Sequence, residues 1–250
     1  MNAIEIENLS VGYGENIALK NINLKIKEGE YNLIIGPNGS GKTTLLKSIL
    51  GQIPINEGQI KIFDKKNHLN NHQISYVPQV NVADRNFPIN VWKFVLSGTM
   101  DSKSVIPFHK FSQDNIESAE EALSLTGMTS FKERYLNELS GGEYAKILIA
   151  RALAGQAKLL LLDEPTAYVD PKSRKEINIL LAKLKVNHTL LVITHDLMAV
   201  DENVDSIICL NGELVYHGKP ELTQEIVDKM YNCHVDLIAH GVAHRVLRRH

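Results

Sequence analysis

Apolar and polar residues alternate near the start of the chain. Residues 3–9 and 17–26 both repeat with period two, which predicts two strands that each expose one face. Short apolar runs bounded by glycine or charged residues indicate more strands, several of them buried on both faces. These further strands are expected at 31–35, 58–63, 74–77, 158–162 and 190–193.

A helical spacing replaces this pattern in the middle of the chain. From about residue 90 to 136, apolar residues recur three and four positions apart, and Ile116, Ala119 and Leu123 form one stripe. We interpret this part as a helical subdomain, at about 90–150, that is inserted into an α/β core. Because strands and helices alternate on both sides of it, the core is expected to contain a mainly parallel sheet.

Three local signals fix the ends of elements. Gly51 follows an amphipathic helical segment and lies where a helix terminator is expected. Asp170 followed by Pro171 predicts a helix start, since aspartate caps a helix and proline fits its first position. Asn211-Gly212, between two short apolar segments, predicts a hairpin.

Composition places the chain among ordinary globular proteins. Of its 250 residues, 44% are hydrophobic and 22% are charged. The formal net charge of −2 argues against a protein that binds nucleic acid through bulk charge. Cys209 and Cys233 form no disulfide framework and indicate a reducing compartment. No secretory signal is visible and no apolar run approaches the roughly 18 residues of a membrane span, so another chain must supply any span.

A glycine-rich loop follows the strand expected at 31–35. Its sequence GPNGSGKT, from Gly36 to Thr43, matches the phosphate-binding pattern G-x-x-x-x-G-K-[ST]. Glycines let the backbone curl so that successive N–H groups face an anion, and the following helix adds the partial positive charge of its N-terminus. Lys42 adds a full charge at the β- and γ-phosphates, and the Thr43 hydroxyl is offered to Mg²⁺. A glycine-rich turn with a surface lysine is the alternative.

Two carboxylates end the apolar run LLLLDE. In open α/β sheets the ligand crevice lies beyond the carboxyl ends of the strands, so Asp163 is expected to face Mg²⁺. Glu164 points to another side and could take a proton from the attacking water. A cap at Asp163 and a solvated turn residue at Glu164 are the alternatives.

The segment LSGGE supports two interpretations together. Ser140 and Glu143 fit the capping box S-x-x-E at a helix start. Gly141 and Gly142, in the first helical turn, each disfavour helix by roughly 1 kcal/mol relative to alanine, and they make sense if the backbone approaches a ligand closely. We therefore expect a capped helix whose N-terminus binds phosphate.

Taken together, GPNGSGKT, LSGGE, LLLLDEP and the histidine of ITHD resemble the nucleotide-binding subunit of ATP-binding cassette (ABC) transporters. The match runs from about residue 3 to 220. It implies a P-loop NTPase core with a mainly parallel sheet, an N-terminal antiparallel β subdomain and an inserted helical subdomain, over residues 1–232, followed by a His- and Arg-rich tail at 233–250. It also implies a head-to-tail homodimer with two ATP molecules, each between the phosphate loop of one subunit and the LSGG segment of the other.

The resemblance assigns roles to single positions. Tyr13 would stack on adenine, with an exposed loop tyrosine as the alternative. Asp170 would cross the dimer interface, although its cap role before a proline is an alternative explanation. His195 would bond the γ-phosphate, and Gln79 would contact Mg²⁺ and water and report occupancy to the helical subdomain.

The resulting site residues form three sets. The expected catalytic residues are Glu164, His195 and Gln79. The expected Mg²⁺ ligands are Thr43, Gln79 and Asp163. The expected ATP-binding residues are Tyr13, Gly36, Pro37, Asn38, Gly39, Ser40, Gly41, Lys42, Thr43, Thr44, Ser140, Gly141, Gly142 and Asp170.

Weaker signals indicate the cargo. The stretch after Gln79, with Asp84, Phe87-Pro88 and Val91, resembles the cassettes of zinc and manganese importers. On a helix, His240 and His244 would share one face and could bind a divalent metal, but a basic, solvated or membrane-proximal end is the alternative. The other tail residues of this kind are Cys233, His234 and His250.

The sequence therefore predicts an ATPase that energises import of zinc or manganese through separate membrane permease subunits. It is expected to act as a homodimer, peripheral to the cytoplasmic face of the membrane, to depend indirectly on a substrate-binding protein and to bind no nucleic acid. An importer of another small solute is one alternative. A soluble ABC-type ATPase that remodels a complex or assembles a cofactor is another, although such proteins often carry tandem cassettes or a long coiled-coil insertion.

Overall fold

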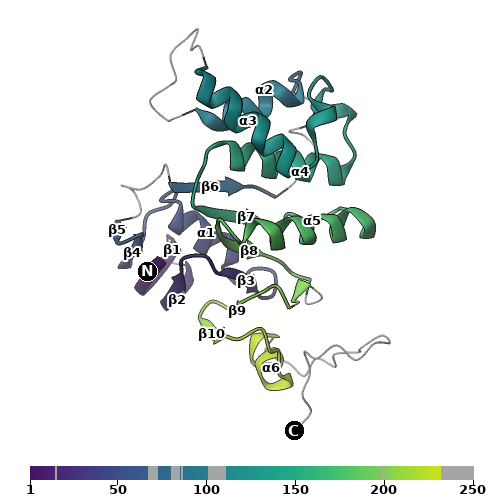
Figure 1. Cartoon of the computed structure of the whole chain (residues 1–250). Coiled ribbons are helices and arrows are strands. Elements are labelled where there is room, and N and C mark those ends of the chain that lie inside the picture. Colours follow the sequence, from purple (N-terminus) through teal and green to yellow (C-terminus); the bar gives the residue numbers. More distant parts are fainter. Residues whose placement is uncertain are drawn as a thin grey trace. The chain divides into compact units, whose positions relative to one another are not determined.

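The computed structural model describes residues 1–14, 16–66, 73–79, 85, 87–100, 111–196, 199–200 and 202–231. They belong to two compact units, one made of Met1–Asn71 with the residues from Thr189 onward, and the other of His72–His188. Figure 1 shows the ribbon with its elements labelled. No described helix combines the length and the apolar character that a membrane span requires.

The first unit contains an antiparallel sheet with the strand order β2-β1-β4-β5. The predicted period-two pattern is confirmed, because alternate residues such as Ile4, Ile6 and Leu24 are buried. Both long strands extend beyond their predicted ends across register shifts, which interrupt the strict alternation. The strands are β1 (Asn2–Tyr13), β2 (Asn16–Lys27), β4 (Glu57–Ile62) and β5 (Lys65–Lys66).

A second group of strands in this unit is parallel. β3 (Tyr31–Ile35) lies between β8 (Thr189–Ile193) and β9 (Ser206–Leu210) and is parallel to both. Every residue of these three strands is buried, as the continuous apolar runs predict. β3 leads directly into the glycine-rich loop, so its carboxyl end sets the position of that loop.

The predicted hairpin is present. β10 (Leu214–Gly218) runs antiparallel to β9, and the backbone N–H of Asn211 donates to the carbonyl of Glu213 at 3.0 Å. Gly212 takes the left-handed φ of 72° that this turn requires.

The described part of this unit also contains two α-helices. α1 (Lys42–Ile49) starts directly after the glycine-rich loop, and Gly51 follows it with a left-handed φ of 68°, as a helix terminator should. α6 (Gln224–Tyr231) was not predicted, although its buried residues Val227 and Met230 lie three positions apart, as on one face of a helix.

The second unit contains a parallel strand pair and most of the helices. β6 (Ile74–Val77) pairs with β7 (Leu159–Asp163). α4 (Gly141–Ala154) packs against α2 (Val91–Leu96) and α3 (Gln113–Leu125), and the three helices lie together in Figure 1. All three helices lie in or overlap the range predicted for the helical subdomain.

The helices of this unit begin at side-chain caps. Ser112 caps α3 and Ser140 caps α4, each in a capping box. α5 (Pro171–Leu184) starts at the predicted proline.

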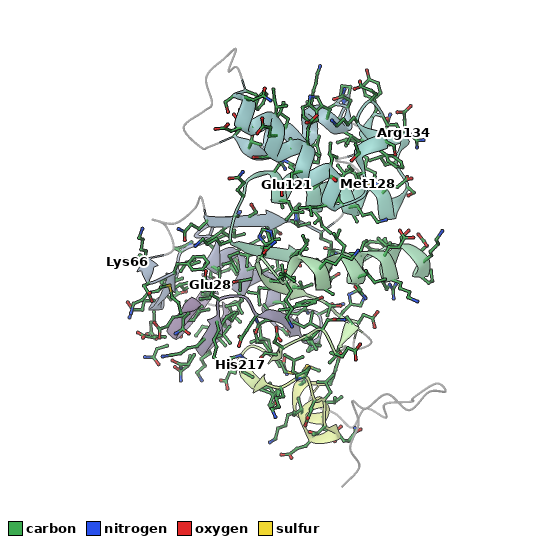
Figure 2. The ribbon with its side chains drawn as sticks, viewed as in Figure 1. Glu28, Lys66, Glu121, Met128, Arg134 and His217 are labelled. Carbon is green, nitrogen blue, oxygen red and sulfur yellow. The ribbon has the colours of Figure 1, made fainter. Side chains whose placement is uncertain are left out.

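Figure 2 shows the side chains of this unit and labels Glu121 on α3, and Met128 and Arg134 beyond it. The side chain of Met128 is buried. Short 3₁₀ turns lie at Ser97–Thr99, Thr129–Phe131 and Leu136–Glu138.

Candidate nucleotide-binding site

The loop that joins β3 to α1 in the first unit curls tightly. A Cβ on Gly36 would clash with the carbonyl oxygen of Leu210 and would lie 2.7 Å from Oγ of Ser40. Gly39 and Gly41 have φ values of 80° and 95°, left-handed conformations that glycine adopts at no steric cost. Backbone geometry therefore requires glycine at these three positions.

Lys42 folds back over this loop. Its Nζ donates to the carbonyl oxygens of Gly36 at 2.8 Å and Pro37 at 2.9 Å, and the residue is only 7% exposed. The neighbouring Ser40 is also buried, and its Oγ has no hydrogen-bond partner in the described part of the chain. The loop thus holds one positive charge and one unused hydroxyl close to its backbone amides.

The N-terminus of α1 is open to an anion. Gly41 provides no side-chain cap, and the first turn contains no acidic residue. The first N–H groups of a helix have no partner within it and carry a partial positive charge. Asn38 and Thr43 are exposed beside them. Curled backbone, lysine and helix N-terminus together fit the phosphates of a nucleotide.

Two more expected nucleotide residues belong to this first unit. Tyr13 ends β1 and is 53% exposed, so its ring is available for stacking. His195 is exposed and follows β8 after Thr194, whose Oγ1 accepts the backbone N–H of Asp196 at 3.0 Å. The adenine and γ-phosphate roles of Tyr13 and His195 stay predictions.

The second unit brings together Gln79, Asp163 and Glu164. Asp163 is the last residue of β7 and is buried, and Glu164 follows it with a left-handed φ of 48°. Such a φ is uncommon for glutamate and is a form of strain often found at functional sites. The Nε2 of Gln79 donates to Oε2 of Glu164 at 2.9 Å. Asp163, Glu164 and Gln79 therefore lie within one unit, whereas Thr43, the remaining expected Mg²⁺ ligand, belongs to the first unit.

Tyr76 joins this group, although it belongs to none of the sequence motifs. Its hydroxyl donates to Oδ2 of Asp163 at 3.4 Å, and burial together with that carboxylate raises the pKa of Tyr76 to about 12. In the parallel register Tyr76 lies opposite Leu161, two residues before the aspartate. The signal that could have found it is this pairing of β6 with β7, which the separate motifs do not reveal.

The start of α4 has the predicted capping box. The backbone N–H of Ser140 donates to Oε2 of Glu143 at 2.7 Å, and Oγ of Ser140 accepts the backbone N–H of Glu143 at 3.3 Å. The structure also shows why position 142 must be glycine: a Cβ there would clash with Cβ and Oγ of Ser173 on α5. A Cβ on Gly141 would lie 3.3 Å from the carbonyl oxygen of Tyr168. Close packing within the unit therefore explains the need for glycine at position 142.

Asp170 caps α5. Its Oδ1 accepts the backbone N–H groups of Lys172 at 3.1 Å and Ser173 at 3.0 Å, which confirms the cap. Hydrogen bonds from Ser173, and secondarily from Lys172, hold the pKa of the Asp170 carboxyl below its usual value. The expected contact of Asp170 with a second subunit stays a prediction.

The chemistry of Asp163 fits a Mg²⁺ ion that phosphate oxygens help to hold. No group of three or more His, Cys, Asp or Glu side chains gathers as a metal site within the described ranges. Mg²⁺ is usually held by one or two carboxylates together with phosphate oxygens and waters. Asp163, at the carboxyl end of a buried strand, is a carboxylate of that kind. The tail residues Cys233, His234, His240, His244 and His250, as well as Asp84, lie outside the described residues.

A phosphate loop after a buried parallel strand and an aspartate-glutamate pair at another strand end define a P-loop nucleotide hydrolase. The family model for ABC transporters matches residues 19–167. The chain therefore belongs to the ABC transporter family, and like the ATP-binding subunits of that family it is an ATPase.

Relatives of known role match nearly the whole chain. The manganese transport system ATP-binding protein MntB of Listeria monocytogenes is 41% identical over 221 residues, which cover 88% of this chain and 91% of that protein. The zinc transport system ATP-binding protein TroB of Treponema pallidum is 35% identical over 232 residues, covering 92% and 86%.

Solved structures agree with the fold. An inward-facing metal-chelate type ABC transporter matches with a TM-score of 0.80 and 30% identity, over 92% of this chain and 89% of that one. A dimeric, post-hydrolysis ATP-binding cassette with bound ADP and phosphate matches with a TM-score of 0.70 and 30% identity, over 88% and 99%. Cassettes of this family therefore bind adenine nucleotides and dimerise.

Proposed function

We propose that this chain is the ATP-hydrolysing subunit that energises import of a divalent metal ion, zinc or manganese, through separate permease subunits. The proposed cargo is supported by the 41% identity, over 88% of the chain, to a subunit named for manganese transport. The 35% identity to a subunit named for zinc transport supports it as well. The intact phosphate loop supports the energising role, because it is built to hold a nucleotide.

In this proposal Lys42 exchanges the carbonyl oxygens of its own loop for the β- and γ-phosphates of ATP. The amides of the loop and of the first turn of α1 orient the phosphates, and Tyr13 stacks on adenine. His195 bonds the γ-phosphate. Asp163, Thr43 and Gln79 would hold Mg²⁺, which neutralises phosphate charge when bound.

Glu164 takes the proton of the attacking water at its carboxylate. Gln79 already bonds this carboxylate, so it can orient the base before a water arrives. Both residues of this bonded pair belong to the second unit.

The active form is proposed to be a homodimer that closes on two ATP molecules. Ser140, Gly141 and Gly142 at the start of α4 would meet the γ-phosphate held by the second subunit, and Asp170 would cross the same interface. Ser140 is exposed and the helix N-terminus carries a partial positive charge, which supports this assignment. Hydrolysis removes the γ-phosphate bridge, and the dimer opens.

The dimer is proposed to work at the cytoplasmic face of the membrane, bound to permease subunits that in turn receive metal from a substrate-binding protein. Gln79 would report nucleotide occupancy to the helical subdomain and so to the permease. The resemblance to a metal-chelate type transporter supports a permease-bound cassette over a free ATPase.

Transport by the reconstituted complex tests this function. The chain and its permease, placed in vesicles with ATP on the side of this subunit, should take up radioactive manganese or zinc, and the Glu164→Gln variant should not. Uptake of another solute in place of these metals would contradict the proposed cargo. ATPase activity with a soluble partner and no permease would contradict the transport role.

A further inference from the structure

Arg85 lies against the N-terminus of α4. Its Nη1 donates to the carbonyl of Leu139 at 3.5 Å, and a Cβ on Gly141 would lie 3.6 Å from its Nη2. The guanidinium also stacks on the ring of Tyr144, 4.8 Å from the ring centre, and that tyrosine is buried. The side chain is thus held in a fixed place beside the first turn of the helix.

This placement leaves the guanidinium incompletely used. Arg85 is half-buried, and its Nε is a buried donor without a hydrogen-bond partner in the described part of the chain. Among the described residues, the guanidinium contacts the carbonyl of Leu139 and the ring of Tyr144, and neither group is an anion. A guanidinium has five donors and favours bidentate contact with phosphate or carboxylate.

The position is also electrostatically unfavourable without an anion. The N-terminus of a helix carries partial positive charge, so cations are normally stabilised at the opposite end. Arg151, in the last turn of α4, shows the favourable arrangement and stacks on Phe94 at 5.0 Å. The only acidic residue in the first turn, Glu143, accepts the backbone N–H of Ser140, and no hydrogen bond or ion pair joins it to Arg85 in the described part of the chain. An anion between the guanidinium and the first-turn amides would remove the conflict.

We propose that Arg85 is a further phosphate-binding residue, which adds its guanidinium to the half-site that Ser140 and the start of α4 offer to the ATP of a second copy of this chain. The inference rests on the proposed homodimer and adds a residue to it. Arg85 is not part of the phosphate loop, so it acts on the closed dimer and leaves nucleotide binding by the single subunit unchanged.

The test uses the full chain with Glu164→Gln, so that ATP is retained. The ATP concentration needed for half-dimerisation is measured by light scattering, and ATP affinity is measured separately at protein concentrations too low for dimers. Adding Arg85→Ala should raise the ATP concentration for dimerisation about tenfold, the usual weight of a hydrogen bond to a charged group, with unchanged affinity of the single subunit. Arg85→Lys should recover part of the loss.

Arg151→Ala is the matched control, because it removes a stacked guanidinium from the other end of the same helix. Equal dimerisation in the Arg85→Ala and Arg151→Ala proteins would overturn the role of Arg85. Should Arg85→Ala fail to fold, Arg85→Gln takes its place. The ATP concentration for half-dimerisation and the ATP affinity of the single subunit are then measured on that variant. If the Glu164→Gln parent binds ATP and stays monomeric, the proposed homodimer itself is overturned. That result is distinct from equal dimerisation of the two arginine variants, which would overturn only the role of Arg85.

Discussion

The side-chain amide of Gln79 donates a 2.9 Å hydrogen bond to the carboxylate of Glu164. Gln79 is exposed and Glu164 is half-buried, so the bond lies at the surface of its unit, where water can reach both groups. Glu164 also has a left-handed φ, and the bond fixes one orientation of a strained residue. The glutamine that is expected to sense the nucleotide therefore directly holds the expected general base.

Gln79→Glu tests this relationship. The change replaces a donor with a second carboxylate at hydrogen-bond distance, and like charges at this distance repel each other. We expect the rate of phosphate release at saturating ATP to fall more in Gln79→Glu than in Gln79→Ala, because alanine removes the hydrogen bond without adding a charge. Equal rates in Gln79→Glu and the parent would separate Gln79 from the base.

Glu164→Gln should leave ATP binding intact and slow turnover by roughly 10²–10⁴-fold, the usual contribution of a positioned base. Steady-state phosphate release and an equilibrium nucleotide titration measure the two quantities. Glu225→Gln on α6 is the control, because that glutamate is exposed and bonds only Lys229 one turn away. Near-normal phosphate release from Glu164→Gln would remove this residue from the base role.

The sequence correctly predicts features that depend only on residues close together along the chain. The capping box at Ser140, the cap at Asp170 and the left-handed Gly212 are all confirmed, because each needs only a few consecutive positions. The contact of Tyr76 with Asp163 depends on which strands pair, and no local pattern fixes that. The packing of Gly142 on α5 likewise depends on tertiary structure.

Lys42→Ala removes the one charge that folds over the phosphate loop. We expect the affinity for ATP to fall about 10- to 100-fold, as for the loss of hydrogen bonds to a charged group, because water replaces the ammonium at the phosphates. A fluorescent nucleotide titration measures it. Lys47→Ala, in the last turn of the same helix, should bind ATP normally. Equal affinities for the two variants would contradict the assignment of the phosphate loop.

Asp170 should make stability depend on pH. Its folded-state pKa lies below the ordinary value of 3.8 because Ser173 and Lys172 donate to the carboxylate. A lowered pKa means that this contribution is fully present above about pH 5 and is lost as the pH falls through the folded-state value. The midpoint of thermal unfolding of Asp170→Ala should therefore lie below that of the parent near neutral pH, and the gap should shrink below pH 3.8.

Asp170→Asn separates the cap from the charge. Asparagine caps a helix about as well as aspartate and does not titrate, so this variant should keep its cap at low pH. Thermal unfolding followed by circular dichroism, at several pH values, compares the three proteins. A constant gap between the parent and Asp170→Ala at all pH values would show that the carboxylate contributes nothing as a charged group.

Gly142→Ala should destabilise the protein, although alanine normally favours a helix. The new methyl group would meet Cβ of Ser173, and overpacking of this kind costs typically about 1–3 kcal/mol. Gly141→Ala has more room, with 3.3 Å to the carbonyl of Tyr168, so the helix propensity of alanine should offset most of the strain. Urea unfolding of the two variants measures the contrast.

Ser173→Gly should rescue Gly142→Ala, because it removes the Cβ that the methyl group meets. Residues in direct contact couple by about 0.5–3 kcal/mol, so the double variant should be more stable than the sum of the single changes predicts. Ser173→Ala should not rescue, since it keeps that Cβ. If the changes in the free energy of unfolding of Gly142→Ala and Ser173→Gly simply add, the glycine is required for something other than this packing. The close approach of a bound phosphate would then be the remaining explanation.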